Sequence, residues 1–334
     1  MMNKMSTVPS VTTLPEVDLR HSPGQLRERL REATHDVGFF YLVGHGVSAE
    51  LTGRVLGAAR RLFALPEAQK DAVAMVRSPH FRGYTRLGGE LTGGEVDWRE
   101  QIDIGPERPT VGGPGKPDYL WLQGPNQWPT GLPELPAIIA EWDTALAAVA
   151  RTLLRHWAAS LGSPPDVFDA AFAATPATLI KIVRYPATAA GSQGVGAHRD
   201  AGVLTLLLAE PCSQGLQVRP SRSGYWIDVP VRDGAFIVNI GELLELATGG
   251  YLRATEHRVN LRQSADRISV PYFFNPRLDA QIPTLSLPPD LATRANPRAD
   301  PVDPIFSVYG RNAWKSRLRA HPDVAAAHGY SSSE

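Results

Sequence analysis

Two histidines and one aspartate in the second half of the chain have the residue types and the spacing of a metal site. His198 and Asp200 are two residues apart, so on an extended chain both side chains point to the same face. His257 would have to reach them from another strand. Two imidazoles and one carboxylate form the facial triad by which proteins hold non-haem Fe(II), with positions left open for O₂ and a co-substrate. These residues therefore predict an iron-dependent oxidation.

A second pair of residues with the same spacing, Arg267 and Ser269, offers a guanidinium fork and a hydroxyl. Together they would make a good receptor for a carboxylate. Both this pair and His198 adjoin short, apolar, strand-like runs, where polar side chains are costly unless they have a use. An iron site with a separate carboxylate receptor is what the co-substrate 2-oxoglutarate requires.

The order and spacing of motifs from Tyr185 to Pro276 resemble the isopenicillin N synthase-like family of 2-oxoglutarate/Fe(II) dioxygenases. The stretch Val37–Val47 is similar to the N-terminal module of that family, so the resemblance covers nearly the whole chain. The matching core segments are Gly215–Val218, Trp226–Val229, Phe236–Gly241 and Ala254–Val259. The resemblance implies a mainly β fold with flanking helices, built on a double-stranded β-helix (jelly roll). It also implies Fe(II), 2-oxoglutarate and O₂, with ascorbate as a candidate reductant.

The resemblance also implies a role for each residue that matches a motif of the family. His198, Asp200 and His257 would bind iron, and no further catalytic residue is expected. Arg267 and Ser269 would bind the remote carboxylate of 2-oxoglutarate. Tyr185 would donate a hydrogen bond to the co-substrate.

Lys181 shares the inward face of its predicted strand with Tyr185, because the two residues are four apart. An ammonium in an apolar cavity needs an anion, which favours an acidic group on the substrate or the co-substrate. Alternatively the side chain reaches out to water. The first interpretation predicts a small or mid-sized carboxylic substrate that is hydroxylated or desaturated. Further candidate substrate contacts are Glu90, Thr92, Leu204, Leu206 and Phe273.

Three alternatives stay open on the sequence alone. A relative could use the same triad without 2-oxoglutarate, as isopenicillin N synthase does, although the iron-binding glutamine of that enzyme has no counterpart after Gln281. Another could use ascorbate, like the plant 1-aminocyclopropane-1-carboxylate oxidases. The third is a non-catalytic β-helix binding protein.

Composition narrows the class of protein. The 334 residues carry 34 basic and 34 acidic side chains, so no basic face suggests nucleic acid. Cys212 is the single cysteine, which excludes an intrachain disulfide. No apolar run approaches the ~20 residues that span a bilayer, and the first residues lack the apolar core of a signal peptide. We expect a cytoplasmic monomer or weak homo-oligomer that acts on a small molecule.

Four regions are expected along the chain. Residues 1–12 form a tail, and residues 13–134 form an N-terminal module with active-site loops. Residues 135–310 form the catalytic core, in which a long amphipathic helix from Leu135 to Leu161 backs short strands that begin near Thr178. Residues 311–334 form a C-terminal helix and tail.

Overall fold

The computed structural model describes residues 13–187, 192–211, 213–221, 223–261, 265–298 and 300–331. The predicted tail, residues 1–12, and Cys212 lie outside the described residues. No helix in these ranges is long and apolar enough to cross a membrane.

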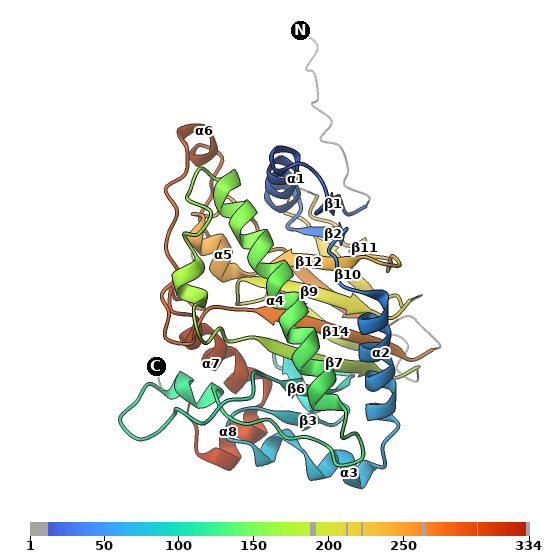
Figure 1. The fold of residues 1–334 in the computed structure, drawn as a ribbon. Coiled ribbons are helices and arrows are strands. Elements are labelled where there is room, and N and C mark those ends of the chain that lie inside the picture. The colour runs from blue at the N-terminus through green and yellow to red at the C-terminus, as the bar shows by residue number, and fades with distance from the viewer. Residues whose placement is uncertain are drawn as a thin grey trace.

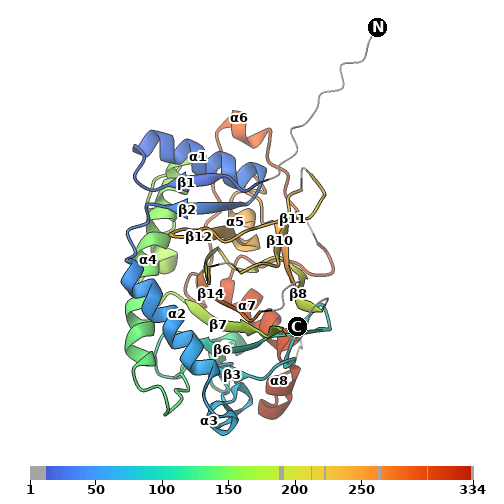
Figure 2. The ribbon, with the colours of Figure 1, turned by 90° about the vertical axis from the view of Figure 1, so that its right-hand side faces the viewer.

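Two facing β-sheets form the centre of the molecule, as the views at right angles show (Figures 1 and 2). The large sheet has the strand order β1-β2-β12-β9-β14-β7-β6-β3, and the small sheet has the order β11-β10-β13-β8. The strands of the large sheet, in that order, are Glu16–Asp18, Phe39–Val43, Phe236–Ile240, Leu204–Ala209, Arg267–Phe274, Leu179–Tyr185, Glu100–Ile104 and Gly83–Thr85. Those of the small sheet are Ile227–Asp228, Leu216–Arg219, Glu256–Asn260 and Gln193–His198. A hairpin of β4 (Glu90–Thr92) and β5 (Glu95–Asp97) lies apart from both.

Helices cover the face of the large sheet that points away from the small sheet (Figure 2). The long helix α4 (Leu135–Ser160) crosses this face with α1 (Pro23–Asp36) and α2 (Ala49–Phe63) beside it. Its end agrees with the prediction to within one residue, and Gly162 with φ +78° follows in the left-handed region that commonly ends a helix. The remaining helices are α3 (Glu67–Ala72), α5 (Glu242–Ala247), α6 (Pro289–Ala292), α7 (Tyr309–Ala320) and α8 (Pro322–His328), with 3₁₀ turns at Met75–Arg77, Asp118–Leu122 and Asp169–Phe172.

Alternation along β9 divides the apolar core in two. Leu204, Leu206 and Leu208 belong to the cluster between the large sheet and the helices, whereas Leu207 packs into the cluster between the two sheets. Leu206 is fully buried on the helix side. The prediction that Leu206 contacts substrate is therefore wrong, because its side chain is enclosed between the large sheet and the helices.

We expect the helix-side core to dominate stability. Trp157 of α4 is fully buried (0 % exposed) and packs edge-on against Phe40 at 6.1 Å between ring centroids. Trp157→Ala should lower the free energy of unfolding by about 3–5 kcal/mol in urea titrations. Trp98, with 42 % of its surface exposed, supplies the matched control. Equal losses from Trp157→Ala and Trp98→Ala would contradict this packing.

Candidate metal centre

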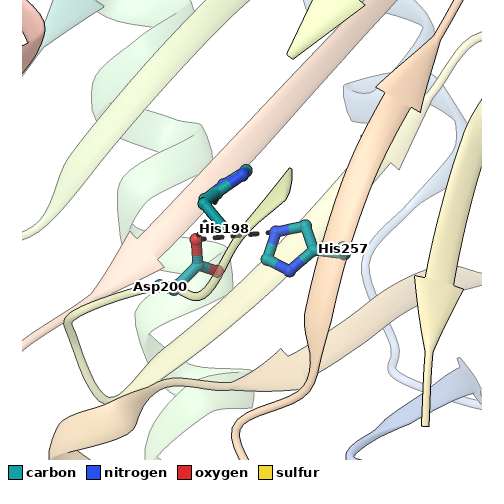
Figure 3. Close-up of side chains that lie close together, drawn as sticks. All are labelled: His198, Asp200 and His257. Atoms are coloured by element: carbon teal, nitrogen blue, oxygen red, sulfur yellow. Dashed lines mark ion pairs between the residues drawn. The ribbon is translucent and has the colours of Figure 1, made fainter. Parts of the chain in front are cut away.

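The side chains of the three predicted metal ligands lie close together (Figure 3). His198 ends β8, and His257 lies directly opposite it on the neighbouring strand β13. Asp200 follows two residues after His198 and places Oδ1 3.7 Å from the Nε2 atom of each histidine. One ligand atom from each residue lies within 4.8 Å of the others, which is close enough for all three to hold one ion.

Both imidazoles are held so that Nε2 faces the centre. His198 Nδ1 lies 2.8 Å from the carbonyl oxygen of Gly196, and His257 Nδ1 lies 3.1 Å from that of Thr255. A carbonyl oxygen can only accept, so each Nδ1 carries the proton and donates it. Nε2 then keeps its lone pair for a metal, the arrangement that outer contacts usually enforce on ligating histidines.

Asp200 is oriented by two side chains that the sequence analysis missed. Its Oδ2 atom accepts hydrogen bonds from Thr205 Oγ1 at 2.6 Å and Asn239 Nδ2 at 2.7 Å. Thr205 and Asn239 are direct partners on β9 and β12. With Oδ2 occupied, Oδ1 is the atom turned toward the histidines. The sequence feature that could have revealed Asn239 is its place as the one polar residue in the otherwise apolar strand Phe236–Ile240.

The protonation states also suit a cation. Burial, and next the charge of the neighbouring His257, lower the pKa of His198 to about 4. Burial pushes the pKa of Asp200 upward, but the histidines and the hydrogen bonds from Thr205 and Asn239 outweigh it and hold that pKa below its usual value. A neutral His198 beside an ionised carboxylate is the state that binds divalent metals.

A buried guanidinium lies between the sheets. Arg267 is 3 % exposed and lies over the ring of Tyr185, with Cζ 4.7 Å from the ring centroid. Its Nε and Nη1 atoms have no hydrogen-bond partner in the described part of the chain. Ser269, also buried, follows on the same face of β14. Unpaired donors of a buried cation are costly, so this pair has the chemistry of a carboxylate receptor.

A cavity of about 990 Å³ opens from the metal centre toward α7. Its wall includes His198 and Asp200 together with all but one of the predicted substrate contacts, namely Glu90, Thr92, Lys181, Leu204 and Phe273. Leu206 is not among the residues that line it, in agreement with its place in the helix-side core.

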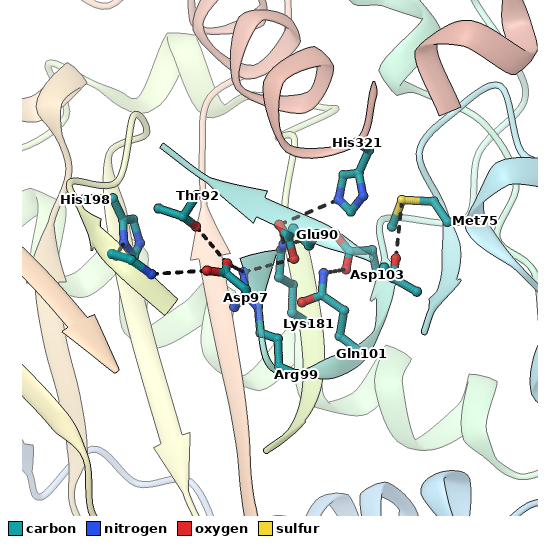
Figure 4. Close-up of polar contacts among 12 residues, drawn as sticks. Met75, Glu90, Thr92, Asp97, Arg99, Gln101, Asp103, Lys181, His198 and His321 are labelled. Carbon is teal, nitrogen blue, oxygen red and sulfur yellow. Dashed lines mark hydrogen bonds and ion pairs between the residues drawn. The ribbon is translucent and has the colours of Figure 1, made fainter. Parts of the chain in front are cut away.

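Lys181 already has its anions. Its Nζ lies 2.7 Å from Glu90 Oε1 and 3.5 Å from Asp103 Oδ2 (Figure 4). Only 10 % of the Lys181 side chain and 6 % of the Glu90 side chain are exposed. Neither interpretation from the sequence holds, because the ammonium is neither in water nor without a partner. The argument from Lys181 to an acidic substrate is therefore wrong, since carboxylates of the protein neutralise it.

This pair belongs to a larger group, here called the buried charge cluster. Arg99 Nη2 lies 2.9 Å from Glu90 and 3.3 Å from Asp97, and Arg317 of α7 lies 2.6 Å from Asp103. Burial pushes the pKa of Glu90 upward, but the charges of Arg99 and Lys181 overcome this and hold it well below its usual value. The cluster consists of Glu90, Asp97, Arg99, Asp103, Lys181 and Arg317, three acids with three bases. Thr92 donates its hydroxyl to Asp97 at 2.7 Å (Figure 4).

Comparison with known proteins gives two family matches. Residues 14–131 match the model described as "non-haem dioxygenase in morphine synthesis N-terminal". Residues 177–276 match the "2OG-Fe(II) oxygenase superfamily". The second match contains all three predicted metal ligands as well as Arg267 and Ser269.

Curated relatives and solved structures agree with these matches. The 2-oxoglutarate-dependent dioxygenase frbJ of Dothideomycetidae sp. is 32 % identical over 94 % of this chain and 91 % of its own. A homoarginine-6-hydroxylase of Glycine max is 32 % identical over 89 % and 92 %. The crystal structure of JOX2 with 2OG, Fe and JA has a TM-score of 0.72 at 25 % identity, over 95 % of this chain and 89 % of that one. Neurospora crassa T7H with alpha-KG and thymine also has a TM-score of 0.72, at 22 % identity over 92 % and 98 %, which confirms the predicted fold.

His321, next to the buried charge cluster, predicts how the stability of the fold depends on pH. His321, at 1 % exposure, has its pKa lowered to about 4 by burial, which outweighs the attraction of Glu90. Between pH 6.5 and 4 the unfolded chain protonates this imidazole while the folded chain does not, so stability falls as the pH falls. His321→Gln should reduce that slope by up to about 1.4 kcal/mol per pH unit. Urea titrations across this range measure it.

His328, half-buried at the end of α8, supplies the control for that experiment. His328→Gln should keep the slope of the parent chain. An unchanged slope in His321→Gln would contradict the neutral, buried state of His321.

Proposed function

Because the chain belongs to the 2OG-Fe(II) oxygenase superfamily and is a 2-oxoglutarate-dependent dioxygenase, we propose that it hydroxylates or desaturates a small carboxylate-bearing substrate. The observation that supports this substrate class is an unpaired, buried arginine, Arg82, in the wall of the cavity that contains His198 and Asp200. Iron and 2-oxoglutarate are the cofactor and the co-substrate of this family.

We assign iron to His198, Asp200 and His257. The two Nε2 atoms and Asp200 Oδ1 supply one imidazole–imidazole–carboxylate face, and the contacts behind them keep each donor turned inward. Iron bound there supplies the O₂ chemistry that couples oxidation of 2-oxoglutarate to succinate and CO₂ with oxidation of the substrate. The protein contributes orientation and exclusion of water.

We assign the remote carboxylate of 2-oxoglutarate to Arg267 and Ser269, with Tyr185 beside them. The unpartnered Nε and Nη1 atoms of Arg267 support this assignment, because a carboxylate accepts charge-assisted hydrogen bonds from buried donors of this kind. The stacked ring of Tyr185 keeps the guanidinium plane in place, and its hydroxyl is the candidate donor to the co-substrate.

Arg82 replaces Lys181 as the residue that we expect to bind the carboxylate of the substrate. It forms no ion pair with any described residue, and its one hydrogen bond within the described ranges runs from Nη2 to the carbonyl oxygen of Leu122 at 2.9 Å. Its Nε has no partner in the same part of the chain. Burial, together with the charge of Arg317, lowers the pKa of Arg82 to about 10, so the cation lacks compensation. Homoarginine, named in several relatives, is an amino acid and carries such a carboxylate.

The metal assignment predicts one Fe(II) per chain in anaerobic calorimetry. His198→Ala or His257→Ala removes one of three donors and should weaken iron binding by about 100-fold or more, beyond the effect of losing an outer contact. His21→Ala, outside the cavity lining, serves as the control. Full iron affinity in either ligand variant would show that the triad is misassigned.

The co-substrate assignment predicts a selective loss in Arg267→Ala. Removing a paired charge from a desolvated site costs about 2–4 kcal/mol, so 2-oxoglutarate affinity should fall roughly 30- to 1,000-fold. Iron binding should persist, and Arg277→Ala, at the surface, should match the parent chain. Unchanged 2-oxoglutarate dependence would favour the 2-oxoglutarate-independent alternative.

The substrate assignment is tested by screening small carboxylic acids and their amides for succinate release. Arg82→Met should raise KM for the active acid about 10- to 100-fold, since charge-assisted hydrogen bonds are lost. KM for the amide, and 2-oxoglutarate turnover without substrate, should change little. Arg77→Met, exposed on the preceding turn, is the control. Equal effects of Arg82→Met on the acid and the amide would exclude Arg82 as the carboxylate contact.

A further inference from the structure

A second cavity, of about 710 Å³, shares part of its wall with the first. Arg199, Pro297 and Arg298 line both cavities, so these residues separate the metal-site cavity from the second one. Two more arginines, Arg253 and Arg294, complete a ring of four guanidinium groups around the second cavity. None of the predicted site residues lines this cavity.

The charges around the second cavity do not balance. Arg298 is neutralised by Glu242 at 3.4 Å and by Glu245 at 3.3 Å. In the ranges that the structure describes, Arg199, Arg253 and Arg294 have no carboxylate within ion-pair distance. Asp36 is the single carboxylate among the described residues that line the cavity. Three cations without ion pairs therefore face one carboxylate.

Contacts with the backbone and with an aromatic ring hold these arginines in position. Arg199 Nε, at 3.1 Å, and Arg298 Nη2, at 3.4 Å, both donate to the carbonyl oxygen of Ala254, which brings two guanidinium groups together. Arg253 Nη1 donates to the carbonyl oxygen of Asn296 at 3.0 Å. Arg294 lies over the ring of Tyr251, 5.7 Å from the centroid.

Like charges that converge in this way repel each other unless an anion lies between them. Among the described residues, the guanidinium groups of Arg199 and Arg253 each donate one hydrogen bond and that of Arg294 none, so further N–H groups are available to a ligand. The fork geometry of arginine matches oxyanions.

We propose that this arginine-lined cavity binds a compact oxyanion of charge −2, the class that includes inorganic phosphate, phosphate monoesters and small dicarboxylates. The site is distinct from the proposed positions of 2-oxoglutarate and of the substrate carboxylate. Arg199 stands between His198 and Asp200 in the chain, so a bound anion contacts a residue adjacent to both proposed iron ligands.

The test is calorimetry of the full chain, without metal, with inorganic phosphate as the probe at constant ionic strength. Leaving out metal prevents phosphate from binding iron. We expect one saturable site, and about 10-fold or more weaker binding in the double variant Arg253→Gln/Arg294→Gln. Arg294→Gln alone, an exposed position, should weaken binding about 3-fold or more without affecting folding. Arg29→Gln, exposed on α1, makes the same charge change away from the cavity and should have no effect.

Further titrations distinguish this cavity from the other two anion positions and phosphate from dicarboxylates. Arg267→Ala and Arg82→Met should bind phosphate like the parent chain, because their cations belong to the other two positions. Malonate that binds as tightly as phosphate identifies a general receptor for doubly charged oxyanions, whereas binding of one alone identifies phosphate or dicarboxylate as the ligand. No saturable binding of either below about 10 mM would overturn the proposal. So would an unchanged affinity in the double variant, or loss of binding in Arg267→Ala.

Discussion

Direct pairing of His198 with His257 across β8 and β13 is the constraint on which the metal centre depends. It places the two imidazoles side by side, with ring centroids 4.3 Å apart. The large sheet orients the third ligand, because Thr205 and Asn239 on adjacent strands hold Asp200 by one oxygen. The two sheets thus contribute separately to one site, and a register shift of one residue in either sheet would turn a ligand away.

The buried charge cluster fixes the position of several elements beside the cavity. It joins residues of the hairpin, of β6 and β7, and of α7, which are far apart in the sequence. Desolvating six charges is costly, and their mutual attraction offsets that cost only when the geometry is good, so such a cluster specifies position more than it adds stability. The acids of the cluster are paired with its own bases, so none of them neutralises Arg82, which lies outside the cluster and remains available to a ligand.

Local spacing predicted that His198 and Asp200 lie close together, because residues two apart on an extended chain share a face, whereas His257 reaches them only through pairing between strands. The long helix was predictable for the same reason, since its apolar residues keep helical spacing. The partner of Lys181 was not predictable, because Glu90 lies 91 residues earlier and only the fold brings the two together. Leu206 was assigned to the cavity because an apolar strand buried on both faces gives no alternation from which to choose a face. Thr205 and Asn239 were missed since their role depends on pairing between strands.

The most direct test of the account is anaerobic absorption spectroscopy of the full chain loaded with Fe(II). In the proposed arrangement, 2-oxoglutarate binds through its 2-oxoacid end and places its remote carboxylate at Arg267. Addition of 2-oxoglutarate should then produce a weak visible charge-transfer band that saturates at one equivalent per chain. Iron that binds tightly without producing any such band would contradict the account, because the metal and the co-substrate would not share one site.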